Sequence, residues 1–259
     1  MSDDEETSRD FVQSLERGIG VIRSFGEEHP RQTLSDVARQ TGYSRAACRR
    51  LLLTLESMGC VGSDGRDFFL LPGVLDVGYS YLSSLPFHGI VEPFIEQLSK
   101  EVNESVSVSV LDGADIVYVS RVATSRIMTV SLSVGHRLPA YCTSMGRVLL
   151  AAMPVSEQRA HLDQTPLIAR TKFSLHTVKE ILAALDQVAK QGWAMVDQEL
   201  EIGLRSIAAP LSDSQGRTVA AMNVSTHIGR TNLKELKEQL VPQLLETAEQ
   251  VNTLLAMRS

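Results

Sequence analysis

Arginine side chains cluster in one short stretch of the sequence. Arg45, Arg49 and Arg50 fall within six residues, and Arg66 follows closely. Arginine makes forked hydrogen bonds to phosphate oxygens and to guanine edges, so the cluster predicts contact with nucleic acid. The alternative is that these arginines only solvate a surface helix, which is the usual role of charge on helices.

Three helical segments position these arginines. Residues 11–27 carry apolar side chains at helical spacing, which predicts a first helix. Thr33 opens a short second helix with a capping-box pattern, and Gly42 provides the left-handed residue that ends it. Ser44 is placed to cap a third helix, and its hydroxyl can also meet a phosphate.

The third helix and the segment after it predict a winged helix-turn-helix. Arg45 and Arg49 are four residues apart and share a face. An Asp-Gly pair between two β-prone runs then predicts a hairpin with Arg66 at its tip. We assign this module to residues 11–71, with Arg45 and Arg49 reading bases and Arg50 and Arg66 meeting phosphates. The predicted DNA contacts are Ser44, Arg45, Arg49, Arg50 and Arg66.

The remaining sequence predicts a linker helix and a second domain. Residues 72–86 form the linker, and residues 87–259 form an antiparallel sheet with helices covering one side, so the fold class is α+β. Strands are expected over 105–111, 115–123, 128–134, 206–210 and 218–226. The first of these alternates strictly between valine and serine. Helices are expected over 88–101, around 148–152, over 177–192 and over 232–257, the last bent by Pro242.

A helix start in the second domain suggests an anion site. The first backbone N–H groups of a helix lack partners, and the helix dipole adds partial positive charge. Thr143, Ser144 and Met145 can therefore hold a carboxylate. The alternative is that Thr143 or Ser144 only caps the helix.

A polar pair interrupts the last predicted strand. Asn223 and Ser225 share a face at period two, and that face points either to the helices or to solvent. In the first case the pair orients a small polar ligand, and in the second case it is ordinary surface. Asp197 and Glu199 either bind a hydroxyl-bearing ligand or pair with charges such as Arg205.

If these segments converge, they suit a small aromatic carboxylate. The helix start supplies donors for the carboxylate, and Asn223 and Ser225 bond hydroxyl groups of the ring. Leu138, Met145 and Met222 are apolar enough to flank the ring. No phosphate-binding glycine loop competes with this interpretation.

Catalytic and metal sites find little support in the sequence. Cys142 and His136 lie six residues apart, but no motif for nucleophilic catalysis accompanies them. The histidines never pair at helical spacing, and the three cysteines show no C-x-x-C spacing. We therefore predict no catalytic residue, metal or cofactor. An enzyme or a redox-sensing regulator that uses Cys142 remains the alternative.

Charge and hydropathy bound the class of protein. The net charge of the 259 residues is −6, yet residues 11–71 carry eight arginines against seven acids, which is +1. No apolar run reaches the ~18 residues of a membrane helix, and the amino end is acidic. We therefore expect a cytoplasmic protein without a membrane segment.

Several stretches together resemble the IclR family of transcriptional regulators over nearly the whole chain. They are residues 11–18, 34–44, 138–147 and 203–210. Residues 44–50 and 81–84 further resemble the branch that responds to aromatic acids such as protocatechuate and 4-hydroxybenzoate in β-ketoadipate degradation. The chain departs from the family pattern at Ser206, where members often have a cysteine, and at 196–199, where members often have adjacent acids.

The resemblance implies a ligand-responsive regulator of aromatic-acid catabolism. It further implies a GAF-like effector domain, and operator DNA bound by a homodimer or a tetramer. The effector pocket is expected at Thr143, Ser144, Met145, Asp197, Glu199, Asn223 and Ser225.

Overall fold

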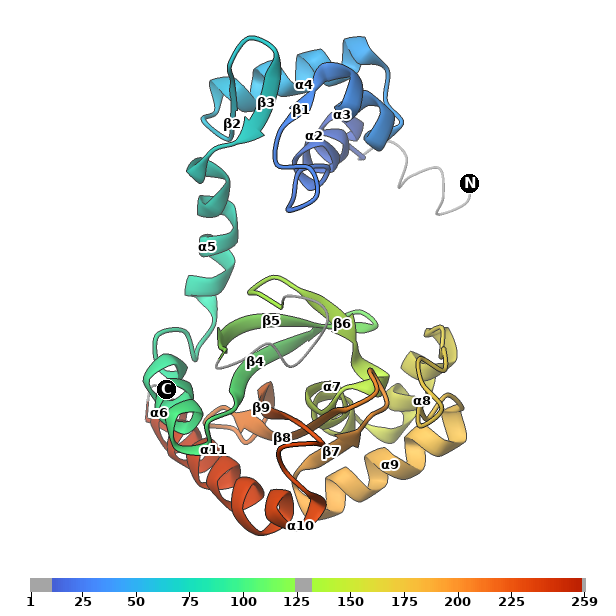
Figure 1. The fold of residues 1–259 in the computed structure, drawn as a ribbon, viewed down its shortest axis with the longest axis vertical. Coiled ribbons are helices and arrows are strands. Elements are labelled where there is room, and N and C mark those ends of the chain that lie inside the picture. Colours follow the sequence, from blue (N-terminus) through green and yellow to red (C-terminus); the bar gives the residue numbers. More distant parts are fainter. Residues whose placement is uncertain (1–10, 124–131, 258–259) are drawn as a thin grey trace. The chain divides into compact units, whose positions relative to one another are not determined.

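The computed structural model describes residues 11–123 and 132–257. The chain divides between Ser84 and Leu85 into two compact units (Figure 1). Each unit buries apolar side chains of its own, so each is described separately.

The first unit is a three-helix module with a small sheet. Its helices are α2 (Gln13–Arg23), α3 (Leu34–Thr41) and α4 (Arg45–Ser57). Its strands are β1 (Gln32–Thr33), β2 (Val61–Ser63) and β3 (Asp67–Leu70), in the order β1-β3-β2. The predicted winged helix-turn-helix is confirmed, while β1, too short to leave a periodic signal, was not predicted.

Local capping sets the helix boundaries in this unit. Thr33 accepts a hydrogen bond from the backbone N–H of Asp36, and the Asp36 carboxylate bonds back to the Thr33 N–H, a complete capping box. Gly42, at φ 72°, ends α3 in the left-handed conformation. Ser44 then caps α4 by accepting from the Ala47 N–H at 3.2 Å.

A short helical stretch ends the first unit. A 3-10 turn, η1 (Pro72–Val74), leads into α5 (Leu75–Ser84), which lies within the predicted linker. None of the side chains of α5 is buried in the described chain.

The second unit is built on a six-stranded antiparallel sheet with the order β6-β5-β4-β9-β8-β7. The strands are β4 (Ser105–Asp112), β5 (Asp115–Val122), β6 (Arg137–Pro139), β7 (Ala194–Asp197), β8 (Leu204–Ser212) and β9 (Thr218–His227). The helical segments are α6 (Val91–Val102), η2 (Ala140–Cys142), α7 (Ser144–Ala151), α8 (Val155–Gln164), α9 (Val178–Gln191), α10 (Leu233–Glu235), η3 (Leu236–Leu240) and α11 (Val241–Ala256). The predicted α+β class is confirmed.

Helices cover both faces of this sheet, not one side as expected. On one face, α6 and α11 pack together against β4 and β8. On the other face, α7 contacts β8 and β9, and α9 packs on the outer side of α7 (Figure 1). The valine face of β4 is fully buried, and so is its serine face. Both faces of the sheet therefore need cover.

Other details of this unit go beyond the expectations or lie partly outside the described residues. The strand expected over 128–134 falls partly outside the described residues, and β5 pairs with β6 instead. The short strand β7 and the helix α8 were not predicted. The last helix contains the π-helical turn η3, which ends two residues before Pro242, whose ring clashes with a regular preceding turn.

Candidate functional site

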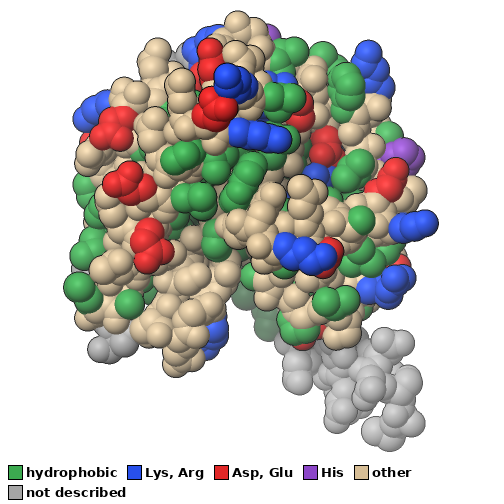
Figure 2. All heavy atoms as spheres, turned by 90° about the horizontal axis from the view of Figure 1, so that it is seen from below, with side chains coloured by type: hydrophobic (Ala, Val, Ile, Leu, Met, Phe, Trp, Pro, Cys, Tyr) green, Lys and Arg blue, Asp and Glu red, His purple; other side chains and the backbone are tan. Residues whose placement is uncertain are grey.

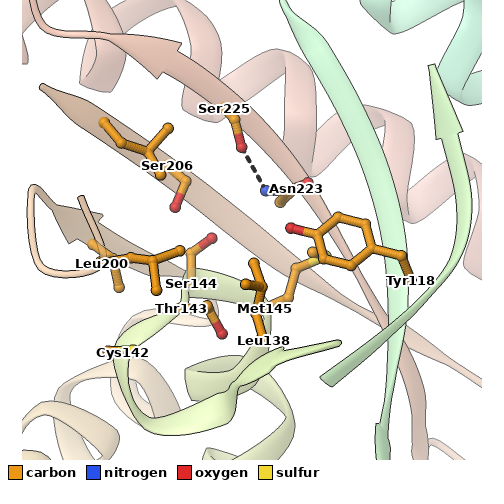
Figure 3. Close-up of a pocket in the computed structure, with 12 residues that line it drawn as sticks. Tyr118, Leu138, Cys142, Thr143, Ser144, Met145, Leu200, Ser206, Asn223 and Ser225 are labelled. Atoms are coloured by element: carbon orange, nitrogen blue, oxygen red, sulfur yellow. Dashed lines mark hydrogen bonds between the residues drawn. The ribbon is translucent and has the colours of Figure 1, made fainter. Parts of the chain in front are cut away.

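A narrow pocket lies between one face of the sheet and the start of α7 (Figure 3). Strands β5, β6, β7, β8 and β9 contribute to its walls, together with the turn before α7 and the loop between β7 and β8. The lining residues are Tyr118, Leu138, Cys142, Thr143, Ser144, Met145, Val196, Leu200, Leu204, Ser206, Asn223 and Ser225.

The sheet wall of the pocket is polar. The register pairs Ser107 with Asn223 and Ser105 with Ser225, so the serine face of β4 and the polar pair of β9 share one face. Asn223 is buried and donates its Nδ2 to the Ser225 hydroxyl at 2.8 Å. Its Oδ1 is buried and has no hydrogen-bond partner among the described residues. The pair thus faces the interior, and one acceptor is left for a ligand.

The helix side of the pocket contributes a second unpaired polar group. Thr143 caps α7, because its Oγ1 accepts from the Gly146 N–H at 3.2 Å. Ser144 is buried, its Oγ has no hydrogen-bond partner in the described chain, and it points into the pocket toward Ser206 (Figure 3). The cap and the candidate ligand group are therefore two different residues.

A close backbone approach holds the start of α7 in place. A Cβ atom on Gly146 would lie 2.1 Å from the carbonyl oxygen of Ala140. Glycine at this position lets α7 begin directly against the turn η2, which sets the position of Ser144.

Asp197 and Glu199 do not line the pocket. Glu199 forms a buried ion pair with Arg147 at 2.6 Å and accepts from the Leu175 N–H. Asp197 pairs with Arg205 at 2.9 Å. Of the two roles considered for these carboxylates, pairing is the one that their contacts show.

The apolar walls differ in part from those expected. Leu138 and Met145 line the pocket, whereas Met222 alternates with Asn223 and lies on the opposite face of the sheet. Tyr118 was not predicted, because the sequence did not say which face of β5 turns inward. Burial raises the pKa of Tyr118 to about 12, so its phenol is a neutral donor and acceptor.

Cys142 lacks the surroundings of a reactive cysteine. It is fully buried, and burial raises the pKa of its thiol to about 11, so the nucleophilic thiolate is scarce at neutral pH. The other two cysteines, Cys48 and Cys60, belong to the core of the first unit. Over residues 11–123 and 132–257, no group of three His, Cys, Asp or Glu side chains is arranged to hold a metal ion.

The predicted DNA contacts of the first unit are exposed. Arg45, Arg49 and Arg50 project from α4, and no described ion pair includes them. Asp64 holds the wing tip by accepting the N–H groups of Arg66 and Asp67, and these bonds lower its pKa to about 2. In contrast to the cluster of arginines on α4, the face of the molecule shown in Figure 2 has basic and acidic side chains interspersed.

Comparison with known proteins decides the family. The model described as the IclR helix-turn-helix domain matches residues 14–65. The model described as the bacterial transcriptional regulator IclR C-terminal matches residues 79–253. The chain belongs to the IclR family.

Individual IclR relatives cover almost the whole chain. It is 47% identical over 237 residues to the Pca regulon regulatory protein of Pseudomonas putida. This alignment covers 91% of this chain and 81% of that protein. It is 31% identical over 258 residues to the p-hydroxybenzoate hydroxylase transcriptional activator of Acinetobacter baylyi. This alignment covers 98% of this chain and 95% of that protein. A solved chain from Rhodococcus sp. RHA1, described as a transcriptional regulator, is 50% identical with a TM-score of 0.88 and covers 96% of this chain and 100% of that chain.

These relatives confirm the prediction of an IclR-type transcriptional regulator rather than an enzyme. The fold also matches more distant IclR structures, such as that of Thermotoga maritima, with 20% identity and a TM-score of 0.79 over 94% of this chain and 98% of that chain. Within the described residues, no helix is long and apolar enough to span a bilayer.

Proposed function

We propose that this chain regulates genes of aromatic-acid catabolism and that a small aromatic carboxylate, bound in the pocket, is its effector. The single observation that carries the proposal is the pocket itself, where two unpaired polar groups, Ser144 Oγ and Asn223 Oδ1, face apolar walls. Such a combination selects a flat, partly polar molecule. The names of the relatives from Pseudomonas and Acinetobacter support this ligand class.

The proposed effector contacts keep the set expected from the sequence, in two roles. Thr143, Ser144, Met145, Asn223 and Ser225 line the pocket. Asp197 and Glu199 act from outside it through their ion pairs. Because the pocket is narrow, an aromatic ring enters only if flexible side chains such as Met145 and Leu200 change rotamer.

A distant structure supports the same ligand class. An IclR homolog from Microbacterium hydrocarbonoxydans was solved in complex with 4-hydroxybenzoate, and it shares the fold of this chain with a TM-score of 0.82 at 20% identity. We take residues 11–71 as the DNA-binding part, 72–86 as the linker, and 87–259 as the part that binds the effector and self-associates in the cytoplasm.

Loss of a base-reading arginine should change specificity. Arg45 and Arg49 sit on the exposed face of α4, away from its buried Cys48, so alanine at either position should cost ~1–3 kcal/mol of operator binding and relax the preference at one base pair. Replacing Arg50 or Arg66 should weaken binding to all DNA sequences alike, and the salt dependence of binding should fall by about one released ion. The measurement is fluorescence anisotropy on a DNA duplex that the wild-type protein enriches from a random pool.

A charge-matched control makes this test specific. Arg159 is exposed on α8 in the second unit, so Arg159→Ala removes the same charge away from the proposed interface and should bind like wild type. Wild-type isotherms for both Arg45→Ala and Arg49→Ala would show that α4 does not read the operator.

We further propose that the regulator is a homodimer that can pair into tetramers. A helix-turn-helix protein gains operator affinity by presenting two recognition helices about one duplex turn apart, which a single copy cannot do. We place self-association on the linker helix α5 and the last helix α11, because large apolar side chains are exposed there: Leu75 (68%), Val77 (73%), Leu254 (40%) and, directly after α11, Met257 (74%).

Sedimentation equilibrium at micromolar concentration should therefore show no stable monomer. The expected species has twice the chain mass, 2 × 28.4 = 56.8 kDa, or a multiple of it. Charged substitution of Val77 should shift the population toward 28.4 kDa. A wild-type protein that sediments only at 28.4 kDa would contradict the dimer.

A further inference from the structure

A row of polar side chains runs across the sheet from the pocket toward its edge. The register places Arg121 of β5 opposite Ser107 of β4, and Ser107 opposite Asn223 of β9, so the three share one face. Neighbouring strands lie ~4.8 Å apart, so the backbone of Arg121 is about 10 Å from that of Asn223. The side chain of Arg121 crosses half of this span, because its Nη1 donates to Ser107 Oγ at 2.9 Å.

Arg121 is a partly buried cation without a carboxylate. None of the ion pairs in the described part of the chain includes it. Its Nε is buried and has no hydrogen-bond partner there. Burial lowers the pKa of Arg121, yet a guanidinium keeps its charge in proteins. A desolvated cation costs free energy until an anion meets it, so this end of the site favours a negative group.

Tyr118 connects the guanidinium to the pocket. The Cζ of Arg121 lies 6.0 Å from the centre of the Tyr118 ring, and that ring lines the pocket beside Met145 and Asn223 (Figure 3). A ligand in contact with Tyr118 and Asn223 is therefore within one side-chain length of the unpaired cation.

The opposite end of the pocket, at the start of α7, is a weaker binding site for an anion. Arg147, the cation on α7 itself, is already paired with Glu199. The Gly146 N–H is already bonded to the Thr143 cap. The unpaired side-chain group there is the Ser144 hydroxyl, which accepts from or donates to a phenol. Hydrogen bonds to a charged guanidinium are about twice as strong as those between neutral groups.

We propose that Arg121 binds the carboxylate of the effector, so that the acid lies with its carboxylate toward Arg121 and its phenolic hydroxyl toward Ser144. This orientation reverses the one that the helix start alone suggests. It rests on the proposed function, because it specifies how the aromatic acid lies in that pocket. Arg121 thereby selects acids over uncharged aromatic compounds of the same shape.

The test compares 4-hydroxybenzoate with 4-hydroxybenzamide, which has nearly the same shape and no charge. By titration calorimetry on the full chain, Arg121→Gln should weaken the binding of 4-hydroxybenzoate about 10- to 100-fold. The affinity for the amide should remain almost unchanged. Arg121→Lys, which keeps the charge without the fork, should fall between wild type and Arg121→Gln. Arg137→Gln removes an exposed arginine of the neighbouring strand β6 and should change neither affinity.

The outcomes separate the orientation from the proposed function. Equal weakening of acid and amide by Arg121→Gln, or no weakening, would overturn the role of Arg121. Wild type that binds neither 4-hydroxybenzoate nor protocatechuate would overturn the proposed function, and the orientation with it. Failure of Arg121→Gln to fold is detected by its thermal unfolding, and Arg121→Lys then carries the test.

A second variant tests the hydroxyl end. Ser144→Ala should reduce the preference for 4-hydroxybenzoate over benzoate and leave the preference for acid over amide intact. Loss of the acid preference in Ser144→Ala would place the carboxylate at the start of α7 instead.

Discussion

Replacing Glu199 by alanine is expected to lower the free energy of unfolding of the second unit by ~3–5 kcal/mol. The side chains of Arg147 and Glu199 are only 4% and 8% exposed, and they meet at 2.6 Å. The variant leaves Arg147 as an uncompensated charge in the core and also removes the acceptor of the Leu175 N–H. Trp193, the only tryptophan, lies in this unit, so urea denaturation followed by its fluorescence reports the loss.

The chain contains a matched control for this effect. Lys190 and Asp186 also meet at 2.6 Å, but their side chains are 74% and 64% exposed, so Asp186→Ala should cost at most ~0.5 kcal/mol. Replacing both Arg147 and Glu199 by apolar residues of similar size should recover much of the stability, since no charge is left unpaired. A loss for Glu199→Ala no larger than that for Asp186→Ala would contradict a buried Arg147–Glu199 ion pair.

Placing a carboxylate at Ser144 is expected to abolish effector binding. Ser144 is 1% exposed and points into a narrow pocket, so Ser144→Glu fills the space of the ligand and adds a negative charge to a pocket that must hold an anion. Ser144→Ala removes one hydrogen bond only and should weaken binding by about 0.5–1.5 kcal/mol. Calorimetry with protocatechuate and 4-hydroxybenzoate measures both effects.

DNA binding provides the internal control for this variant. The first unit has its own core, including Val21, Val37 and Leu52, so Ser144→Glu should bind the enriched duplex with wild-type affinity in the absence of effector. If Ser144→Glu retains DNA binding and still binds either acid as wild type does, the effector site lies elsewhere in the chain.

Features with local causes could be predicted from the sequence. The capping boxes at Thr33 and Thr177 and the turn residue Gly42 act within four residues of themselves, so their types alone fix helix ends. The alternation of β4 similarly predicts two faces. The identities of Asn223 and Ser225 as a same-face pair follow from the same periodicity.

Features set by distant partners could not be predicted. Glu199 is 52 residues from Arg147, and no local pattern says that these two charges meet in the core. The inward face of β5, and with it the positions of Tyr118 and Arg121, depends on a bulge opposite Val108 and Ser109 that shifts the register. The sequence therefore located six lining residues, but it missed Arg121.

The most direct test of the central claim is a calorimetric titration of the wild-type chain with 4-hydroxybenzoate and protocatechuate, with glucose as a ligand of another class. An aromatic-acid-responsive regulator should bind at least one of the two acids saturably, with about one molecule per chain, and should show no heat with glucose. Absence of saturable binding for both acids would contradict the account, leaving an IclR-family regulator whose effector belongs to another chemical class.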